Sequence, residues 1–215
     1  MEDRVTRILD VLAETYPDAA CALDHRNPFE LLVATILSAQ CTDVRVNQIT
    51  KTLFARAADP QAMLDLGVEG VKELIWGCGL HNNKAANIVA ACREIIEKHG
   101  QEVPSEREAL EALPGVGRKT ANVVLSNAFG QPAIAVDTHV FRVSNRLGLA
   151  AAPTPEKTEL QLMAAFPQER WTRAHHLIIF HGRNICKARR PECHRCPVAL
   201  DCIYYQKGET HADNQ

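Results

Sequence analysis

The sequence predicts an all-α fold, and three observations lead to that prediction. Apolar residues recur at three- and four-residue steps through most of the chain. Prolines stand between these periodic segments, where helices begin or end. No stretch shows the strict apolar–polar alternation of a half-buried strand. We therefore expect roughly ten helices joined by short turns.

The helical segments follow one another along the whole chain. The clearest periodic stretches are 29–37, 88–96, 119–129, 140–147 and 177–180. The prolines between segments are Pro28, Pro60, Pro104, Pro114, Pro155 and Pro167. With 215 residues, the chain is long enough for one large domain or two small ones, and no linker between domains is evident.

Composition excludes some classes of protein and leaves others open. The chain contains no run of about 18 uncharged apolar residues, so the sequence predicts no membrane span. The segment that follows Met1 is charged and mixed, without the apolar core of a signal peptide, so we expect a cytoplasmic protein. The net charge of −2 does not exclude DNA as a partner, because a protein that acts at one site on DNA needs a basic face and not a basic total charge. Residues 170–195 contain seven Lys and Arg against one acid, Glu192, although a solvated charged face is the ordinary explanation of such a run.

Four of the eight cysteines are concentrated near the C-terminus. They are Cys186, Cys193, Cys196 and Cys202, with the spacing C-x6-C-x2-C-x5-C. Four thiolates in one short segment repel each other unless a metal neutralises them. Zinc usually takes two close cysteine pairs, and only Cys193 and Cys196 form one, whereas the longer spans suit a wider iron–sulfur cube. The spacing alone leaves both metals open.

A glycine-rich turn lies between two helical segments. The string Leu113-Pro114-Gly115-Val116-Gly117-Arg118-Lys119 follows one predicted helix and leads into the next. Gly115 and Gly117 can adopt backbone angles that other residues avoid. The amides of the turn and of the following helix start can then face an anion, so the string predicts a DNA-phosphate site rather than an ordinary turn. The spacing of a nucleotide-binding P-loop is absent.

Lys119 and Asp137 are the candidate chemical pair. Lys119 lies in the first turn of a helix beside Arg118, where the helix dipole and the neighbouring cation disfavour an ammonium and favour a nucleophilic amine. Most lysines are simply solvated, however. Asp137 lies at an apparent helix start, so its simplest role is an N-cap. A carboxylate held there can also stabilise positive charge on a sugar.

Together these motifs resemble the endonuclease III family, bacterial DNA glycosylases of the helix-hairpin-helix superfamily that also cut abasic sites. The resemblance extends from Pro28 to Cys202 and is carried by 28–32, 37–40, 113–121, 136–139 and the cysteine spacing. It implies that the four cysteines hold a structural [4Fe–4S] cluster. It also implies two helical domains with a DNA-binding groove between them: a helical barrel with the hairpin over 22–132, and an iron–sulfur domain over 1–21 plus 133–215.

The resemblance also implies roles for individual residues. Lys119 and Asp137 match the catalytic lysine and aspartate, and Gln40 and Leu80 match residues that enter the DNA stack. The loop between the first two cysteines, which the family uses against the DNA backbone, carries Lys187, Arg189 and Arg190. The implied activity is removal of oxidised pyrimidines from duplex DNA, followed by β-elimination 3′ to the abasic site through a lysine Schiff base. Glu192 is a charge expected to weaken the loop's contact with DNA, and we expect a monomer.

Two alternatives to this function can be compared with the sequence. The related adenine glycosylase usually lacks a lysine at the position of Lys119 and has an additional C-terminal domain, whereas this chain has the lysine and ends soon after Cys202. A non-enzymatic DNA-binding or electron-transfer module would need neither Lys119 nor Asp137.

Overall fold

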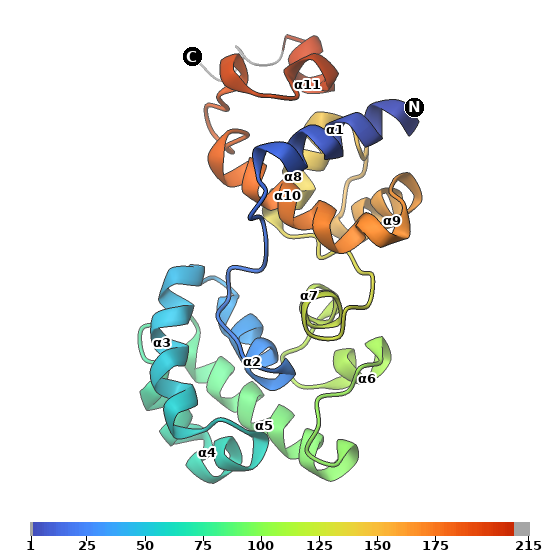
Figure 1. Ribbon diagram of the computed structural model, residues 1–215. Helices are drawn as coiled ribbons and strands as arrows, with labels where there is room; N and C mark the ends of the chain where they lie inside the picture. The colour runs from blue at the N-terminus through green and yellow to red at the C-terminus, as the bar shows by residue number, and fades with distance from the viewer. Residues whose placement is uncertain (1, 209–215) are drawn as a thin grey trace. The chain divides into compact units, whose positions relative to one another are not determined.

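The computed structural model describes residues 2–208, and this part of the chain contains eleven α-helices, three short 3-10 turns and no strand (Figure 1). The predicted all-α class is therefore confirmed. The chain divides into two compact units. The central unit is Cys21–Gln131, and the terminal unit combines Met1–Ala20 with Pro132–Gln215. No helix in the described part is long and apolar enough to cross a membrane.

The central unit is built around one buried helix. Its helices are α2 (Pro28–Ser38), α3 (Asp43–Arg56), α4 (Pro60–Leu74), α5 (His81–His99), α6 (Arg107–Ala112) and α7 (Arg118–Ala128). All residues of α2 from Phe29 to Leu37 are buried, and the helix packs against α3, α5 and α7. Because α2 is largely apolar and buried on every side, it is stable only when neighbouring helices surround it.

Capping residues explain where several of these helices begin. Asn27 accepts a hydrogen bond from the Glu30 amide at 2.9 Å, and the Glu30 side chain accepts one from the Arg26 amide at 2.8 Å. Asp59 caps α4 in the same way as Asn27 caps α2, and each cap is followed by a proline at the first helical turn. Proline is favourable there because its missing N–H has no partner inside the helix.

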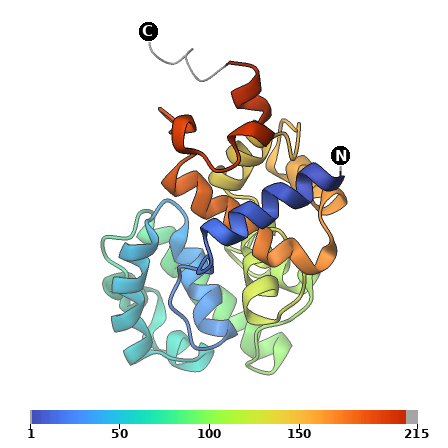
Figure 2. The same ribbon diagram turned by 45° about the horizontal axis from the view of Figure 1, so that its top comes forward.

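The terminal unit has its own hydrophobic core. It contains α1 (Glu2–Thr15), α8 (Thr138–Leu147), α9 (Pro155–Ala165), α10 (Trp171–Asn184) and the short α11 (Ile203–Gln206). Helix α10 packs against α8 and α1, and α1 crosses α10 in both ribbon views (Figures 1 and 2). Fully buried side chains in this core include Ile8, Leu12, Val143 and Ile178.

Arginines of the first helix connect the two ends of the chain. Arg4 donates to the carbonyls of Leu147 at 3.0 Å, Gly148 at 2.7 Å and Asp201 at 2.5 Å. Arg7 forms an ion pair with the Asp201 side chain at 2.6 Å. These contacts join α1 to the C-terminal segment that contains the four clustered cysteines.

Candidate functional site

The glycine-rich turn forms a tight hairpin between α6 and α7. The Val116 amide donates to the Leu113 carbonyl at 3.0 Å, and Gly115 has a φ of 79°. A Cβ atom on Gly115 would lie 2.9 Å from the Cβ of Asn87 on α5. Position 115 therefore requires glycine for two reasons, a left-handed backbone and the close approach of a neighbouring helix.

The hairpin leaves the N-terminus of α7 without a side-chain cap. Gly117 occupies the N-cap position and makes no side-chain cap hydrogen bond, and the first turn contains no acid. Gly115, Gly117 and Lys119 are all exposed. Because the first amides of a helix have no acceptor within it and carry the positive end of the dipole, this end suits a phosphate oxygen. Lys119 stands in the same turn.

Asp137 is the N-cap of α8 in the terminal unit. Its Oδ1 accepts a hydrogen bond from the Val140 amide at 2.7 Å, and the residue is half-buried. The capping role expected from the sequence is therefore present. Lys119 belongs to the central unit and Asp137 to the terminal unit.

Gln40 and Leu80 lie on two adjoining loops of the central unit. Gln40 follows α2, and Leu80 immediately precedes α5. Both are exposed, and both have left-handed backbones, with φ values of 53° and 61°. The loops come close together, because a Cβ on Gly79 would lie 3.0 Å from the Gln40 carbonyl oxygen. The structure thus brings together two residues that are forty positions apart in sequence.

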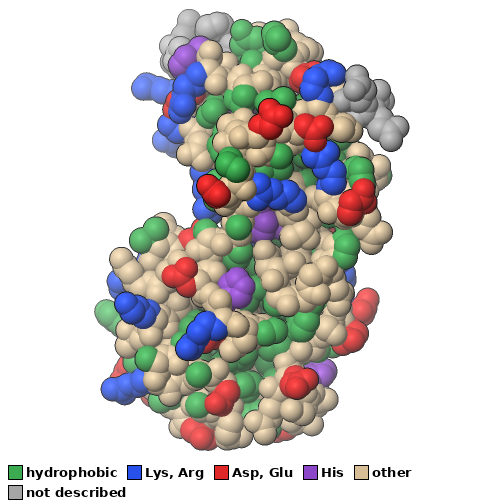
Figure 3. All heavy atoms as spheres, in the orientation of Figure 1, with side chains coloured by type: hydrophobic (Ala, Val, Ile, Leu, Met, Phe, Trp, Pro, Cys, Tyr) green, Lys and Arg blue, Asp and Glu red, His purple; other side chains and the backbone are tan. Residues whose placement is uncertain are grey.

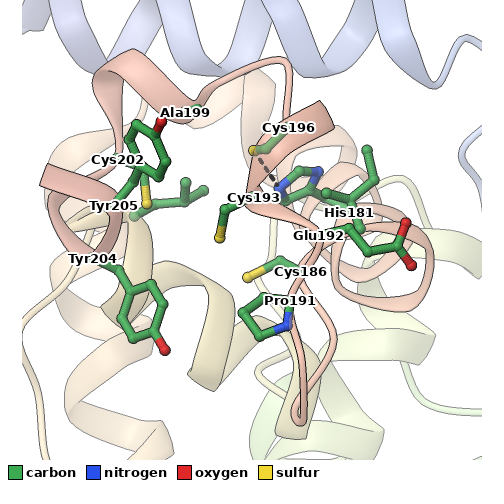
Figure 4. Close-up of a pocket in the computed structure, with 12 residues that line it drawn as sticks. His181, Cys186, Pro191, Glu192, Cys193, Cys196, Ala199, Cys202, Tyr204 and Tyr205 are labelled. Atoms are coloured by element: carbon green, nitrogen blue, oxygen red, sulfur yellow. Dashed lines mark hydrogen bonds between the residues drawn. The ribbon is translucent and has the colours of Figure 1, made fainter. Parts of the chain in front are cut away.

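The four clustered cysteines line one hollow of the terminal unit (Figure 4). Cys186 follows α10, Cys193 and Cys196 bound a 3-10 turn, and Cys202 precedes α11. In Figure 4 the thiols of Cys186 and Cys193 point toward each other, while the Cys196 thiol contacts His181 Nε2 at 3.6 Å. Within the described residues, no group of three Cys, His, Asp or Glu side chains is arranged to hold a single metal ion.

The surroundings of these thiols include donors that favour a thiolate. Burial raises the pKa of Cys202 and raises the pKa of Cys196 to about 11. Backbone N–H groups oppose this: the Val198 amide lowers the pKa of Cys196, and those of Tyr205 and Tyr204 lower the pKa of Cys202. Arg146 Nη1 lies 3.8 Å from the Cys186 sulfur. Four thiols with N–H and cationic donors fit an anionic thiolate-bound cluster.

The predicted DNA-contact loop lies between Cys186 and Cys193. Lys187, Arg189 and Arg190 are exposed, and Arg190 has a φ of 50°. Lys187 forms an ion pair with Glu192, which also pairs with Arg195. Figure 3 shows basic side chains gathered on the side of this unit that carries the C-terminal segment.

Two arginines that the sequence analysis did not single out hold this loop. Arg142 Nη2 donates to the carbonyls of Cys186 at 3.0 Å and Gly182 at 3.1 Å. Arg146 Nη1 donates to the Lys187 carbonyl at 2.7 Å, and its Nη2 donates to that of Ala188 at 3.0 Å. The two arginines are four residues apart on α8, about one helical turn, and this spacing in the sequence predicts that both side chains lie on the same face of the helix.

The fold and these features define a class: an all-helical DNA-repair protein with a helix-hairpin-helix motif. Comparisons with known proteins agree. Residues 33–168 match the model of the "HhH-GPD superfamily base excision DNA repair protein" family. The chain is 53% identical to the endonuclease III of Haemophilus influenzae over 94% of its length and 96% of the relative's, and 52% identical to that of Escherichia coli K12 over 93% and 95%.

A solved structure extends the likeness to three dimensions. It is a trapped covalent intermediate of an endonuclease III with DNA, with a TM-score of 0.92 and 48% identity, covering 97% of this chain and 99% of that one. The chain therefore belongs to the HhH-GPD superfamily of base excision DNA repair proteins. It is an enzyme, a DNA N-glycosylase with lyase activity at abasic sites.

Proposed function

We propose that this chain removes oxidised pyrimidines from duplex DNA and then cuts the strand 3′ to the abasic site, with Lys119 as the nucleophile. The observation that carries the proposal is the exposed, uncapped start of α7, which combines a phosphate-binding geometry with Lys119 in one helical turn. A phosphate held by the hairpin amides fixes the DNA backbone beside the amine.

The reaction is a covalent sequence at the sugar. The Lys119 amine attacks C1′, and the bond to the damaged base breaks. The sugar ring opens to a Schiff base between Lys119 and C1′. Loss of a proton from C2′ then moves electrons into a new C2′–C3′ double bond, and the 3′ phosphate leaves. Asp137, held at the start of α8, stabilises positive charge that develops on the sugar.

Access to the base requires that the nucleotide leave the stack. We assign Gln40 and Leu80 to the space that it vacates, because both are exposed at the ends of adjoining loops. Gly115, Gly117, Lys187, Arg189 and Arg190 are assigned to the DNA backbone. The solved relative is a covalent intermediate with an estranged adenine, which supports both the covalent step and the disruption of pairing.

The cofactor proposed for the cysteine hollow is a [4Fe–4S] cluster. Cys186, Cys193, Cys196 and Cys202 would hold it, and the donors around their sulfur atoms fit its negative charge. When bound, it supplies a rigid crosslink of the segment from Cys186 to Cys202 and takes no part in breaking bonds. The chain's own residues, Arg142 and Arg146, fix the basic loop beside it.

We propose residues 22–132 as the helical barrel domain and residues 1–21 with 133–215 as the iron–sulfur domain, which the compact units support. We further propose a cytoplasmic monomer that acts at the bacterial nucleoid and whose partner is duplex DNA with damaged bases or abasic sites.

Trapping with borohydride tests the role of Lys119. Reduction of the Schiff base should join the protein covalently to DNA that contains an abasic site, and Lys119→Ala should abolish this product. Lys98→Ala, on an exposed helix face, is the matched control and should trap normally. Undiminished trapping by Lys119→Ala would remove this lysine from the mechanism.

A second variant separates capping from catalysis at Asp137. Asparagine is an N-cap as good as aspartate, so Asp137→Asn keeps the start of α8 while removing the charge. We expect normal DNA binding with excision reduced by about a hundredfold or more, the magnitude typical of a lost electrostatic contact. Unchanged excision would assign Asp137 to capping alone.

A further inference from the structure

Lys84 is a buried lysine beneath the two loops that carry Gln40 and Leu80. It lies on the first turn of α5, where its amide donates to the Leu80 carbonyl at 3.0 Å. Only 4% of the residue is exposed. A lysine is rarely buried unless its amine has partners, so the contacts of its Nζ atom need an explanation.

The Lys84 amine joins two separate segments of the chain. Nζ lies 2.9 Å from the Leu37 carbonyl oxygen and 2.5 Å from that of Ala39, both at the C-terminal end of α2. It also lies 3.3 Å from the sulfur of Cys78, in the turn before α5. A lysine amine offers three donors, and here they meet three acceptors. The Cys78 thiol itself donates to the Leu37 carbonyl at 3.2 Å, which closes the network.

These acceptors sit at the bases of the two loops. Ala39 is the C-cap of α2 and the residue directly before Gln40, and Cys78 is two residues before Leu80. The last carbonyls of a helix have no amide partner within it and carry the negative end of its dipole. Lys84 satisfies two such carbonyls and fixes the direction in which the chain leaves α2.

The loops need such a support because their backbones are strained. Gln40 and Leu80 are two of the four non-glycine residues with positive φ in the described chain. A left-handed backbone is unfavourable for such residues and persists only where the surroundings impose it. Arg45 adds a second, weaker support, since its Nη2 donates to the Trp76 carbonyl at 3.3 Å.

We propose that Lys84 is a positioning residue that locks the Gln40 and Leu80 loops in the shape required to enter the DNA stack. The inference rests on the proposed function, which assigns Gln40 and Leu80 to the vacated space. Lys84 contacts no DNA itself. It acts by holding two loop backbones at once, so that both side chains are in place before the nucleotide leaves the duplex.

The first test is Lys84→Met, which keeps an unbranched apolar side chain and removes all three donors. Excision of a damaged base from duplex DNA should fall about ten- to a hundredfold, since misplacement by about 1 Å has effects of this size. Binding of undamaged duplex should be unchanged. Lys98→Met, on the exposed face of the same helix, is the control and should keep full activity. Unchanged excision by Lys84→Met would overturn the proposal.

A double-mutant cycle shows whether Lys84 acts through the two loops. In a background with Gln40→Ala and Leu80→Ala, the further change Lys84→Met should cost less than threefold, because there are no side chains left to position. An undiminished further loss in that background would overturn the proposal and make Lys84 a purely structural residue. Full activity of the Gln40→Ala, Leu80→Ala enzyme itself would instead refute their assignment in the proposed function, and the inference with it.

A spectroscopic readout distinguishes positioning from stability. A fluorescent adenine analogue placed opposite the lesion brightens when it loses its stacking partner. With the wild-type protein it should brighten on binding, and with Lys84→Met it should not, at protein concentrations that saturate the DNA. With Lys84→Gln, which retains an amide donor, the analogue should brighten partly. This variant replaces Lys84→Met in the experiment if Lys84→Met fails to fold. Wild-type brightening in a folded Lys84 variant would count against the proposal.

Discussion

Glu192 forms ion pairs with two basic side chains near the proposed cluster, Lys187 and Arg195. Its carboxylate accepts hydrogen bonds from Lys187 and Arg195, and these bonds lower the pKa of Glu192 to about 2. The carboxylate is thus charged at every physiological pH. Because a phosphate must compete with this acid for Lys187, the ion pair lowers the electrostatic attraction of the loop for DNA.

Glu192→Gln should therefore strengthen binding of undamaged duplex a few-fold and make it more dependent on salt. Each additional phosphate contact makes the slope of log affinity against log salt more negative by about one. Fluorescence anisotropy over a series of salt concentrations measures both quantities. Glu69→Gln removes a comparable acid, paired with Lys72 in the central unit, and should change neither. Weaker binding by Glu192→Gln would mean that the acid orients the loop instead.

His181 connects the proposed cluster to Tyr16, the residue that follows the first helix. The Tyr16 hydroxyl lies 3.1 Å from Nδ1, and the Cys196 sulfur lies 3.6 Å from Nε2. Burial lowers the pKa of His181 to about 4, so the ring is neutral at pH 7 and carries one proton. If Tyr16 donates to Nδ1, the proton resides on Nε2 and faces the sulfur, as is usual for a residue that supports a metal ligand.

His181→Leu should accordingly make a bound cluster more labile without removing any ligand. The visible absorbance of the purified protein in air should decay several-fold faster than that of the wild type. Tyr16→Phe, which removes only the hydroxyl, should give a smaller acceleration. Equal decay rates in all three proteins would show that the Cys196 sulfur needs no donor from His181.

At the scale of elements, the α6–α7 hairpin depends on the backbone of Gly115. Gly115→Ala forces a side chain into a left-handed conformation and against Asn87, so the free energy of unfolding should fall by about 1–2 kcal/mol. DNA affinity should fall with it, because the hairpin amides move. Gly100 also has a positive φ, 59°, with open space around it. Gly100→Ala should lose similar stability, measured by urea unfolding, and should keep its affinity for DNA. Equal losses of DNA affinity in the two variants would contradict the assignment of the hairpin to DNA binding.

Features that depend on residues close together in the sequence could be predicted, whereas features that depend on contacts between distant parts of the chain could not. The hairpin and the cap at Asp137 are determined by residues within a few positions of each other, and the structure contains both. The metal could not be chosen from the cysteine spacing, because cluster size is not encoded locally. From the sequence alone Lys84 is expected to be a surface lysine of an amphipathic helix, since two of its three acceptors, the carbonyls of Leu37 and Ala39, are more than forty residues away.

At the scale of the whole molecule, the terminal unit is assembled from both ends of the chain. Helix α1 packs on α10, and Arg4 reaches carbonyls at both Leu147 and Asp201. The C-terminal segment therefore depends on a helix that is synthesised first. Two buried histidines of α10, His176 and His181, lie within this unit, and their protonation makes its stability depend on pH.

Burial and the nearby charges of Arg173 and Arg183 lower the pKa of His176 to about 4, against 6.5 for an unperturbed histidine. The unfolded chain thus binds a proton below pH 6.5 that the folded protein rejects, so stability present above pH 6.5 is lost as the pH falls toward 4. His181 behaves in the same way. Each histidine should remove about 2 kcal/mol of stability between pH 7 and pH 5.

Urea unfolding of the wild type and of His176→Gln at pH 7 and pH 5 measures this contribution. Glutamine takes up no proton, so the drop in unfolding free energy between the two pH values should shrink by about 2 kcal/mol in the variant, whatever its stability at pH 7. A drop of the same size in His176→Gln and the wild type would show that the folded protein accommodates a charged His176 and that the acid sensitivity of the terminal unit arises from other groups.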